Sequence, residues 1–325
     1  MMTAKNYSQD FLSHRQSISS DPPYGNRRDA LRDAPRQLKR RARKFVGLPA
    51  SDDVGTLSSL ITFLKYTAEG HLDQHPVTAA IAATPHLIAL YAEDLIDAFE
   101  YSGLQYLPTP VHSKLVYETG PAYAGCGFGL CSDYKNSTAC RAEERNMTLE
   151  TVSVILYTRS VLTVTFTITR GAYYAYEPPT RRVEDFTLGS NARSKYPDED
   201  DYWERVFTTL GQTMQDKHWP TPRKVLLMGE SVHDQFFMTV LEAALRSIGG
   251  VELPEVWGEE PVFVAARGAA EMAKRAMYNG ENAKLAGDDV DLGEWELDAG
   301  SGRLDECALA CLEEEMADIE SVEEL

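Results

Sequence analysis

One short segment combines residue types and spacing that could do chemistry. The hydrophobic run 224–228 leads into GESVH, residues 229–233, and an amphipathic stretch follows directly. A strand that turns at a glycine into a helix leaves backbone N–H groups at the helix N-terminus, where an anion or nucleotide can bind. The same letters nearly match G-x-S-x-G, the nucleophile elbow of serine hydrolases. His233 replaces the last glycine, and a base two residues from Ser231 cannot readily reach round to deprotonate it. We therefore expect a nucleotide pocket or a simple tight turn.

Two further segments could serve such a pocket. PVFVAARGAAEMAKRA, residues 261–276, has a helical pattern but is unusually rich in Ala and Gly. A glycine in mid-helix, here Gly268, costs about 1 kcal/mol relative to Ala, so we expect another element to pack closely there. Arg159 lies in a predicted hairpin turn, where it could meet a phosphate without a metal or could simply be exposed to solvent.

Other groups of polar residues predict no site. His71 and His75 are four residues apart but lack the glutamate of a zinc protease, and Cys307 and Cys311 have no further ligand nearby. We expect no metal site from either pair. Four carboxylates follow helical spacing opposite an apolar stripe, which predicts a solvated helix face: Glu93, Asp94, Asp97 and Glu100.

Charge is unevenly distributed along the 325 residues, whose net charge is −18. Residues 1–45 carry 11 Lys/Arg and 4 Asp/Glu, whereas residues 281–325 carry 2 and 16. The basic cluster RQLKRRARK, residues 36–44, could serve nuclear import or nucleic-acid binding, but its position in a Pro-containing leader favours a solvated basic segment. No apolar run reaches the roughly 18 residues that span a bilayer.

The cysteines and sequons leave the compartment open. Cys131 and Cys140 bracket a polar loop, and the N-glycosylation sequons at Asn136 and Asn146 lie within or just after it. A third sequon begins at Asn6. A loop closed by two cysteines beside sequons fits an oxidising secretory compartment. The N-terminal residues lack the apolar core of a signal peptide, which favours the cytoplasm or nucleus.

The elements that would position these residues follow from periodicity. Helical spacing predicts helices over 54–72, 86–104, 199–218 and 231–250 and a small-residue helix from 119. Strand patterns predict a short buried strand over 77–85, two or three antiparallel strands over 151–178, a strand over 223–230 and an extended segment at 254–257. Residues 1–45 form a basic leader predicted as disordered or as a short basic helix. Residues 281–325 form an acidic, mostly disordered tail, in which a last helix can form from Leu304 to Leu325.

Three segments in this order resemble one known family. VLLMGESVHDQFFMTVL resembles the adenosine segment of the seventy-kilodalton heat-shock chaperones, where a strand, G-G-S-x-R and a helix follow with the same spacing. PVFVAARGAAEMA is similar to that family's P-x-x-x-V-A-x-G-A-A. ATPHLIALYAEDLIDAFEYSGLQYL, followed by YETGPAYAGCGFGL, is similar to its V-P-A-x-F…A-G-L and E-P-x-A-A-A-x-A-Y-G-L. The resemblance covers about residues 46–280, and fungal proteins with an actin-like ATPase domain are the most similar group.

This resemblance implies an α/β fold with two lobes, the actin-like ATPase (ribonuclease H-like) fold, with an incomplete first lobe. Residues 46–150 would form the partial first lobe and 151–280 the second. Gly229 and Ser231 would lie at the adenosine, and His233 would replace an arginine that packs on the base. Gly268 would mark the close helix at the lobe junction. Glu118 aligns with the first residue of the motif that connects the lobes.

The departures from the family concern the phosphates. Residues 1–60 lack the family's D-x-G-T strand, and LYTRSVLTV stands where D-x-G-G-G-T is expected. Glu230 replaces the second glycine of the adenosine motif, which places a negative charge near a phosphate. A magnesium nucleotide needs carboxylate ligands and close backbone approach. We therefore predict a non-hydrolysing pseudo-ATPase that acts by binding a protein partner, with weak ATP or ADP binding, no metal site and no nucleic-acid role. The alternatives are an active ATP-binding chaperone-like ATPase from a truncated gene model, and a glycosylated structural protein of the secretory pathway.

Overall fold

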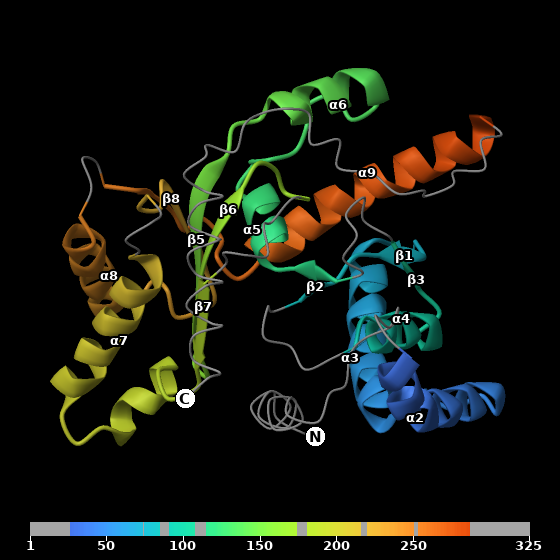
Figure 1. The fold of residues 1–325 in the computed structure, drawn as a ribbon, viewed down its shortest axis with the longest axis horizontal. Helices are drawn as coiled ribbons and strands as arrows, with labels where there is room; N and C mark the ends of the chain where they lie inside the picture. Colours follow the sequence, from blue (N-terminus) through green and yellow to red (C-terminus); the bar gives the residue numbers. More distant parts are fainter. Residues whose placement is uncertain are drawn as a thin grey trace. The chain divides into compact units, whose positions relative to one another are not determined.

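The computed structural model describes residues 27–73, 75–84, 91–107, 115–173, 181–215, 220–249 and 253–286, with side chains to residue 278. These residues form a mixed α/β structure (Figure 1). The chain divides into two compact units, Met1–Gly280 and Glu281–Leu325. Everything that follows concerns the first unit, apart from the last residues of helix α9.

A five-stranded mixed sheet, in the order β7-β6-β5-β8-β9, forms the centre of the larger group of elements. Its strands are β5 (Glu150–Tyr157), β6 (Leu162–Thr169), β7 (Arg181–Asp185), β8 (Lys224–Met228) and β9 (Glu255–Trp257). β5 and β6 form an antiparallel hairpin closed at the pair Tyr157 and Leu162, and β7 continues antiparallel to β6. β5, β8 and β9 are parallel to one another.

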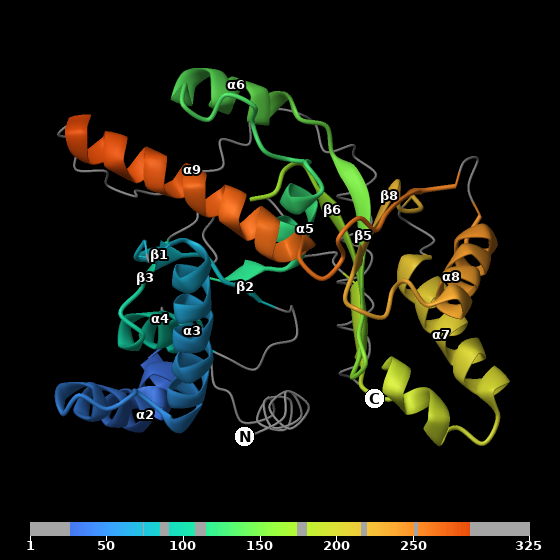
Figure 2. The same cartoon turned by 180° about the vertical axis from the view of Figure 1, so that it is seen from behind.

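Both faces of the sheet are covered, which explains why β5 is buried along most of its length. Ile155 and Tyr157 face a core with α7 (Glu199–Met214) and α8 (Gln235–Ser247). Val152 and Val154 face a second core that contains residues of α5 (Thr119–Gly125) and α9 (Val264–Ala286). Figures 1 and 2 show α7 and α8 on one side of the sheet and α5 and α9 on the other. Successive strand residues point to opposite faces, so a strand covered on both sides is buried on both, including polar residues such as Ser153 of β5 and Thr165 of β6.

Helices α5 and α9 pack with almost no side chain between them. A methyl group on Gly268 would overlap the Pro121 carbonyl oxygen and lie 2.6 Å from the Gly125 amide nitrogen. A methyl group on Gly125 would overlap the Val264 carbonyl oxygen. The Arg267 guanidinium also donates to the Gly125 carbonyl oxygen across this contact, at 2.9 Å. The Ala/Gly composition of residues 261–276 is therefore explained by the backbone of α5.

A smaller group of elements precedes the sheet. It contains α2 (Arg27–Phe45), α3 (Asp52–His71), α4 (Ala92–Tyr101), β1 (Ala79–Ala80), β2 (Ala83–Thr84), β3 (Gln105–Tyr106) and β4 (Val116–Tyr117). β1 pairs with β3 and β2 with β4, each in parallel. Val54 of α3 and Ala98 of α4 are fully buried against each other's helices, with Leu57 and Ile61 beside them. Ser51 caps α3 by accepting from the Val54 amide at 3.1 Å, the arrangement expected for a helix N-cap.

Helix α2 corrects two sequence predictions at once. Residues 27–45, predicted as disordered or at most briefly helical, form a 19-residue helix, while the rest of the leader lies outside the described residues. Its basic side chains bind the acidic face of α4, so three of the four carboxylates there are largely shielded from solvent. Arg40 and Lys44 both donate to Asp97, whose side chain is only 1% exposed, and Lys44 also pairs with Glu100. Burial raises the pKa of Asp94, on the same face, to about 6.

Several predicted boundaries also change. The strand predicted over 77–85 is two separate two-residue strands, β1 and β2. The helix predicted over 86–104 is α4, which begins at Ala92 and ends at Tyr101, and Gly103 follows it at φ +66°. Residues 86–90 lie outside the described ranges. The loop between Cys131 and Cys140, which are disulfide-bonded, leads into α6 (Ser137–Asn146), which the polar sequence did not predict. α9 continues to Ala286, and residues 287–325 of the predicted acidic tail lie outside the described residues.

Candidate functional site

The candidate site lies at the carboxyl ends of β5 and β8. These strands are parallel neighbours, but the chain leaves β5 toward β6 on one side of the sheet, whereas β8 has β9 on the other. Ligands of open α/β sheets bind at such points, where the connections from adjacent strands diverge. Both segments singled out from the sequence, the turn at Arg159 and the GESVH motif, end here. The fold therefore brings them together.

Gly229 makes this approach of the two segments feasible. Its φ is +98°, and a methyl group on it would overlap the Tyr157 carbonyl oxygen. That same carbonyl accepts from the Ser231 amide at 3.1 Å, and the Gly229 amide donates to the Pro261 carbonyl at 3.0 Å. Gly229 thus ties together the ends of β5, β8 and the segment that enters α9.

The core beneath holds Tyr157 in place. Its ring stacks on that of Phe237, with centroids 4.3 Å apart, and its hydroxyl lies 2.9 Å from that of Tyr202. Tyr202 donates in turn to the Leu188 carbonyl oxygen at 2.9 Å. The floor of the candidate site is therefore fully buried and held by ring stacking and hydrogen bonds.

The hairpin turn 158–161 has its amide groups occupied by side chains of this chain. The Thr158 hydroxyl oxygen accepts from the amides of Ser160 and Val161, at 3.2 and 3.1 Å. The Glu230 carboxylate accepts from the amide of Arg159 at 3.0 Å, and the Arg159 guanidinium lies 3.9 Å from the same carboxylate. Three consecutive N–H groups that could receive a phosphate are thus already satisfied, one of them by a carboxylate.

The segment after β7 packs over this turn. The amides of Ser190 and Asn191 donate to the carbonyls of Thr158 and Arg159, both at 3.0 Å. A methyl group on Gly189 would lie 2.6 Å from the Arg159 carbonyl oxygen. These contacts hold the turn and leave little room above its backbone.

The described surroundings of Ser231 resemble a structural contact between segments. The Ser231 hydroxyl pairs with the Ser190 hydroxyl at 2.9 Å, and His233 is exposed. Within the described residues, no histidine makes a hydrogen bond to Ser231, which agrees with the rejection of a nucleophile elbow. The serine instead links the two segments that border the turn.

The N-terminus of α8 does not follow Gly229 directly and does not leave all its first amides free. The helix begins at Gln235, after a turn of four residues that follows Gly229. Asp234 is its N-cap and accepts from the amides of Phe236 and Phe237 at 2.9 and 3.1 Å. An aspartate before two hydrophobic residues is an N-cap signature, so the sequence contained this signal.

Gly268 and Glu118 lie at the α5–α9 contact and at the start of α5. Gly268 packs against α5, as described above, and not against GESVH. Glu118 precedes α5 and its side chain has no hydrogen-bond or ion-pair partner in the described part of the chain. Burial, followed by the nearby Glu184 carboxylate, raises the pKa of Glu118 to about 8. The resemblance singled out Glu118 but not its burial, because burial depends on contacts that are remote in sequence, such as the one with Glu184.

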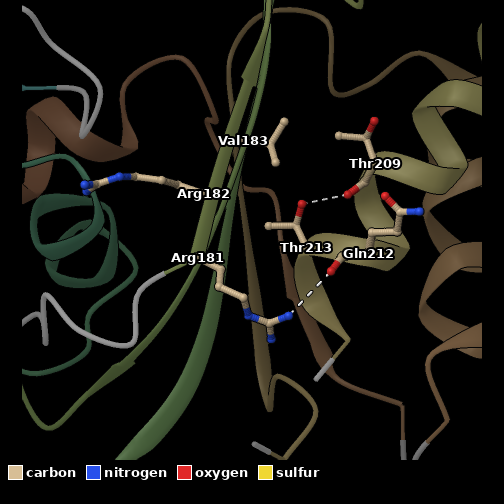
Figure 3. Close-up of a pocket in the computed structure, with 6 residues that line it drawn as sticks. All are labelled: Arg181, Arg182, Val183, Thr209, Gln212 and Thr213. Carbon is tan, nitrogen blue, oxygen red and sulfur yellow. Dashed lines mark hydrogen bonds between the residues drawn. The ribbon is translucent and has the colours of Figure 1, made fainter. Parts of the chain in front are cut away.

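A pocket of about 480 Å³ lies elsewhere, between β7 and α7, and is lined by Arg181, Arg182, Val183, Thr209, Gln212 and Thr213. Figure 3 shows Arg181 and Val183 pointing toward α7 and Arg182 pointing away on the opposite side of the strand. The Arg181 guanidinium donates to the Gln212 and Gln215 carbonyls, and Thr213 donates to its own helix at Thr209. These polar groups serve the β7–α7 contact and do not converge on the pocket.

Candidate metal ligands are few among the described residues. Cys131, Cys140 and Glu144 lie close together, but the two sulfurs are bonded to each other and offer no thiolate. His71 ends α3 and contacts the Thr67 carbonyl oxygen at 2.8 Å, with no metal group around it in the described ranges. Cys307 and Cys311 lie outside those ranges. Among the described helices, none combines the length and apolar character needed to cross a bilayer.

Comparison of the sequence with protein-family models and with curated proteins gave no match. The function must therefore be argued from the geometry of the site.

Proposed function

We propose that this chain is a non-hydrolysing pseudo-ATPase with an actin-like (ribonuclease H-like) fold, which binds nucleotide weakly and acts by binding a protein partner. The observation that carries the proposal is the occupied hairpin turn. Thr158 and Glu230 satisfy the amides of residues 159–161, where a phosphate-binding turn would leave them free. An anion at this turn would face the Glu230 charge and would have to displace existing hydrogen bonds.

Two features of the fold support the actin-like part of the proposal. The sheet order β7-β6-β5-β8-β9, with β6 antiparallel and β5, β8 and β9 parallel, is typical of ribonuclease H-like sheets. The close crossing of α5 and α9 is what the resemblance implies for the two small-residue helices at a lobe junction. Under this proposal the adenosine would lie at Gly229 and Ser231, beside the exposed His233.

Calorimetric titration of the full chain with ATP and ADP, with and without magnesium, tests this function. We expect a dissociation constant of about 1 mM, or about −4 kcal/mol, with no dependence on magnesium and no phosphate release. Glu230→Gln should tighten ATP binding several-fold because it removes a like charge, whereas Glu242→Gln, an equal charge change on the exposed face of α8, should not. The absence of any heat at millimolar nucleotide would contradict the nucleotide-binding part. Strong tightening by magnesium, or turnover, would favour the active ATPase instead.

A second candidate function, a glycosylated structural protein of the secretory pathway, is favoured by the disulfide Cys131–Cys140. Disulfides form and persist mainly in oxidising compartments. Asn136 and Asn146 are both exposed beside it, at the two ends of α6. Protein purified from its own cells should then shift in mobility on glycosidase treatment and should resist alkylation at both cysteines. An unglycosylated chain with two alkylated cysteines would remove this candidate.

A further inference from the structure

Helix α2 has two faces with different roles. The face described above binds α4 through Arg36, Arg40 and Lys44. The opposite face carries Leu31, Leu38 and Phe45 at intervals of seven residues, with side-chain positions on one stripe of the helix. These three residues are 75%, 72% and 91% exposed. Side chains this exposed contribute little to the core of the chain, and their grouping on one face points to an interaction surface.

The apolar stripe continues beyond the helix. Val46 and Leu48, in the turn that follows, are 64% and 50% exposed. Ala34, Pro35 and Ala42 are also exposed and lie on the same side of α2 between the large residues. The stripe therefore widens at the C-terminal end of α2 into a small apolar cluster.

Basic residues border this stripe and are not used by the fold. At about 100° per residue, Arg28, Arg32 and Lys39 lie along one side and Arg41 along the other. All four are exposed, and none has an ion-pair partner within the ranges that the structure describes. The basic residues that do bind α4 lie on the opposite face, so the two sets are separate.

We propose that this outer face of α2 docks on an anionic lipid surface. A helix with an apolar stripe flanked by Lys and Arg lies in the plane of a membrane interface, with its apolar side chains at the acyl boundary and its cations among anionic headgroups. The ion pairs to α4 hold α2 with this stripe outward before any membrane is met. Docking therefore requires no unfolding of the contact that fixes the helix.

Two other occupants fit the face less well. A nucleic acid would favour a continuous basic face, but here the apolar stripe separates Arg41 from the other three cations. A partner helix in a coiled coil would normally need three or more heptads, and the stripe on α2 covers only two, with Pro35 on the contacting side. A flat surface also accepts Val46 and Leu48, which lie beyond the helix.

Vesicle flotation of the full chain tests the proposal. Vesicles of phosphatidylcholine with phosphatidylserine should bind at least tenfold more protein at low salt than vesicles of phosphatidylcholine alone, and added salt should weaken this binding. In the triple variant Arg28→Gln, Arg32→Gln, Lys39→Gln, the affinity for anionic vesicles should fall roughly fivefold for each charge removed. In the triple variant Leu31→Ser, Leu38→Ser, Phe45→Ser, binding to anionic vesicles should fall at least tenfold. Both variants should keep the wild-type far-UV circular dichroism because the substituted residues are exposed.

The matched control lies on α3. Leu60→Ser, Phe63→Ser, Leu64→Ser removes three apolar side chains that are 51%, 67% and 56% exposed, and it should bind vesicles like the wild type. The proposal is overturned if the wild type does not bind anionic vesicles, if it binds neutral ones equally, or if the α3 variant loses as much. If the wild type binds no vesicles, but the Leu31, Leu38, Phe45 variant binds a double-stranded DNA probe as well as the wild type does, the exposed basic residues of α2 would be assigned to nucleic-acid binding instead.

Discussion

The α2–α4 pair and the α5–α9 pair are both helix contacts between distant parts of the sequence, yet their chemistry is opposite. α2 and α4 meet through long charged side chains, with Asp97 buried between Arg40 and Lys44. α5 and α9 meet through glycines, so that the backbone of one touches the backbone of the other. The first contact depends on charge and geometry at the ends of flexible side chains, and the second on the absence of side chains.

The difference predicts how each contact fails. Close backbone packing cannot accommodate even one added methyl group, because the neighbouring atoms belong to the main chain. A cluster of ion pairs loses stability when one partner is removed, because the remaining charges stay partly buried without compensation. The predictions below separate these two modes of failure, from the largest expected effect to the smallest.

Gly268→Ala should be the most damaging substitution. Its methyl group would overlap the Pro121 carbonyl, so we expect a loss of about 4 kcal/mol in the free energy of unfolding, measured by urea denaturation. Gly211→Ala is the matched control in α7, where the nearest atom to an added methyl group is 4.0 Å away. That substitution should stabilise the chain by up to about 1 kcal/mol. Equal effects of the two would show that α5 and α9 are not in backbone contact.

Glu118, at the start of α5, should make stability fall as the pH rises. Its folded pKa, about 8, is raised by burial above the value of an unfolded chain. Between those two pKa values the folded state holds a proton that the unfolded state has lost, so stability decreases with rising pH. We expect a loss of about 3 to 4 kcal/mol between roughly pH 5 and pH 8.

Glu118→Gln isolates this effect, since the amide does not titrate. The difference between wild type and variant in denaturation midpoint should grow across the same pH range. A wild type and variant with parallel pH profiles would contradict the burial of this carboxyl.

Asp97→Asn should destabilise the α2–α4 contact by about 2 kcal/mol, because Arg40 and Lys44 lose a buried acceptor charge but remain partly accessible to water. Glu100→Gln provides the comparison on the same face. Its side chain is 63% exposed, so its loss should cost no more than about 0.5 kcal/mol. Thermal denaturation of both variants checks this, and equal costs would mean that Asp97 is not buried.

The smallest expected effect is that of salt, which should weaken the α2–α4 contact but not the α5–α9 contact. Raising the ionic strength screens the outer ion pairs of α2 and should reduce amide hydrogen-exchange protection in α2 by less than about 1 kcal/mol. Protection in α5 and the first turns of α9 should stay unchanged, because no charge pair holds their backbones together. A parallel loss in both pairs would indicate global destabilisation and not screening.

The sequence predicted where the strand ends and turns of the candidate site form. Gly229 and Ser231 lie at the end of a buried strand, as the hydrophobic run and the glycine indicated, and Arg159 lies in a hairpin turn. The sequence also showed that something must approach Gly268 closely. It did not show that Thr158 and Glu230 would satisfy the turn amides, because Glu230 lies 71 residues from Arg159 along the chain.

Local patterns by themselves determined where most helices and strands form, since hydrophobic periodicity and glycine reflect burial and backbone conformation at each residue. Only the tertiary structure decided which partners those elements meet. The acidic face of α4 and the basic face of α2 each look solvated in isolation, because an ion pair depends on both charges and on the distance between them. The small residues of α9 can be recognised from its sequence. Which backbone packs against them, Pro121 to Gly125 of α5, is decided only by the fold.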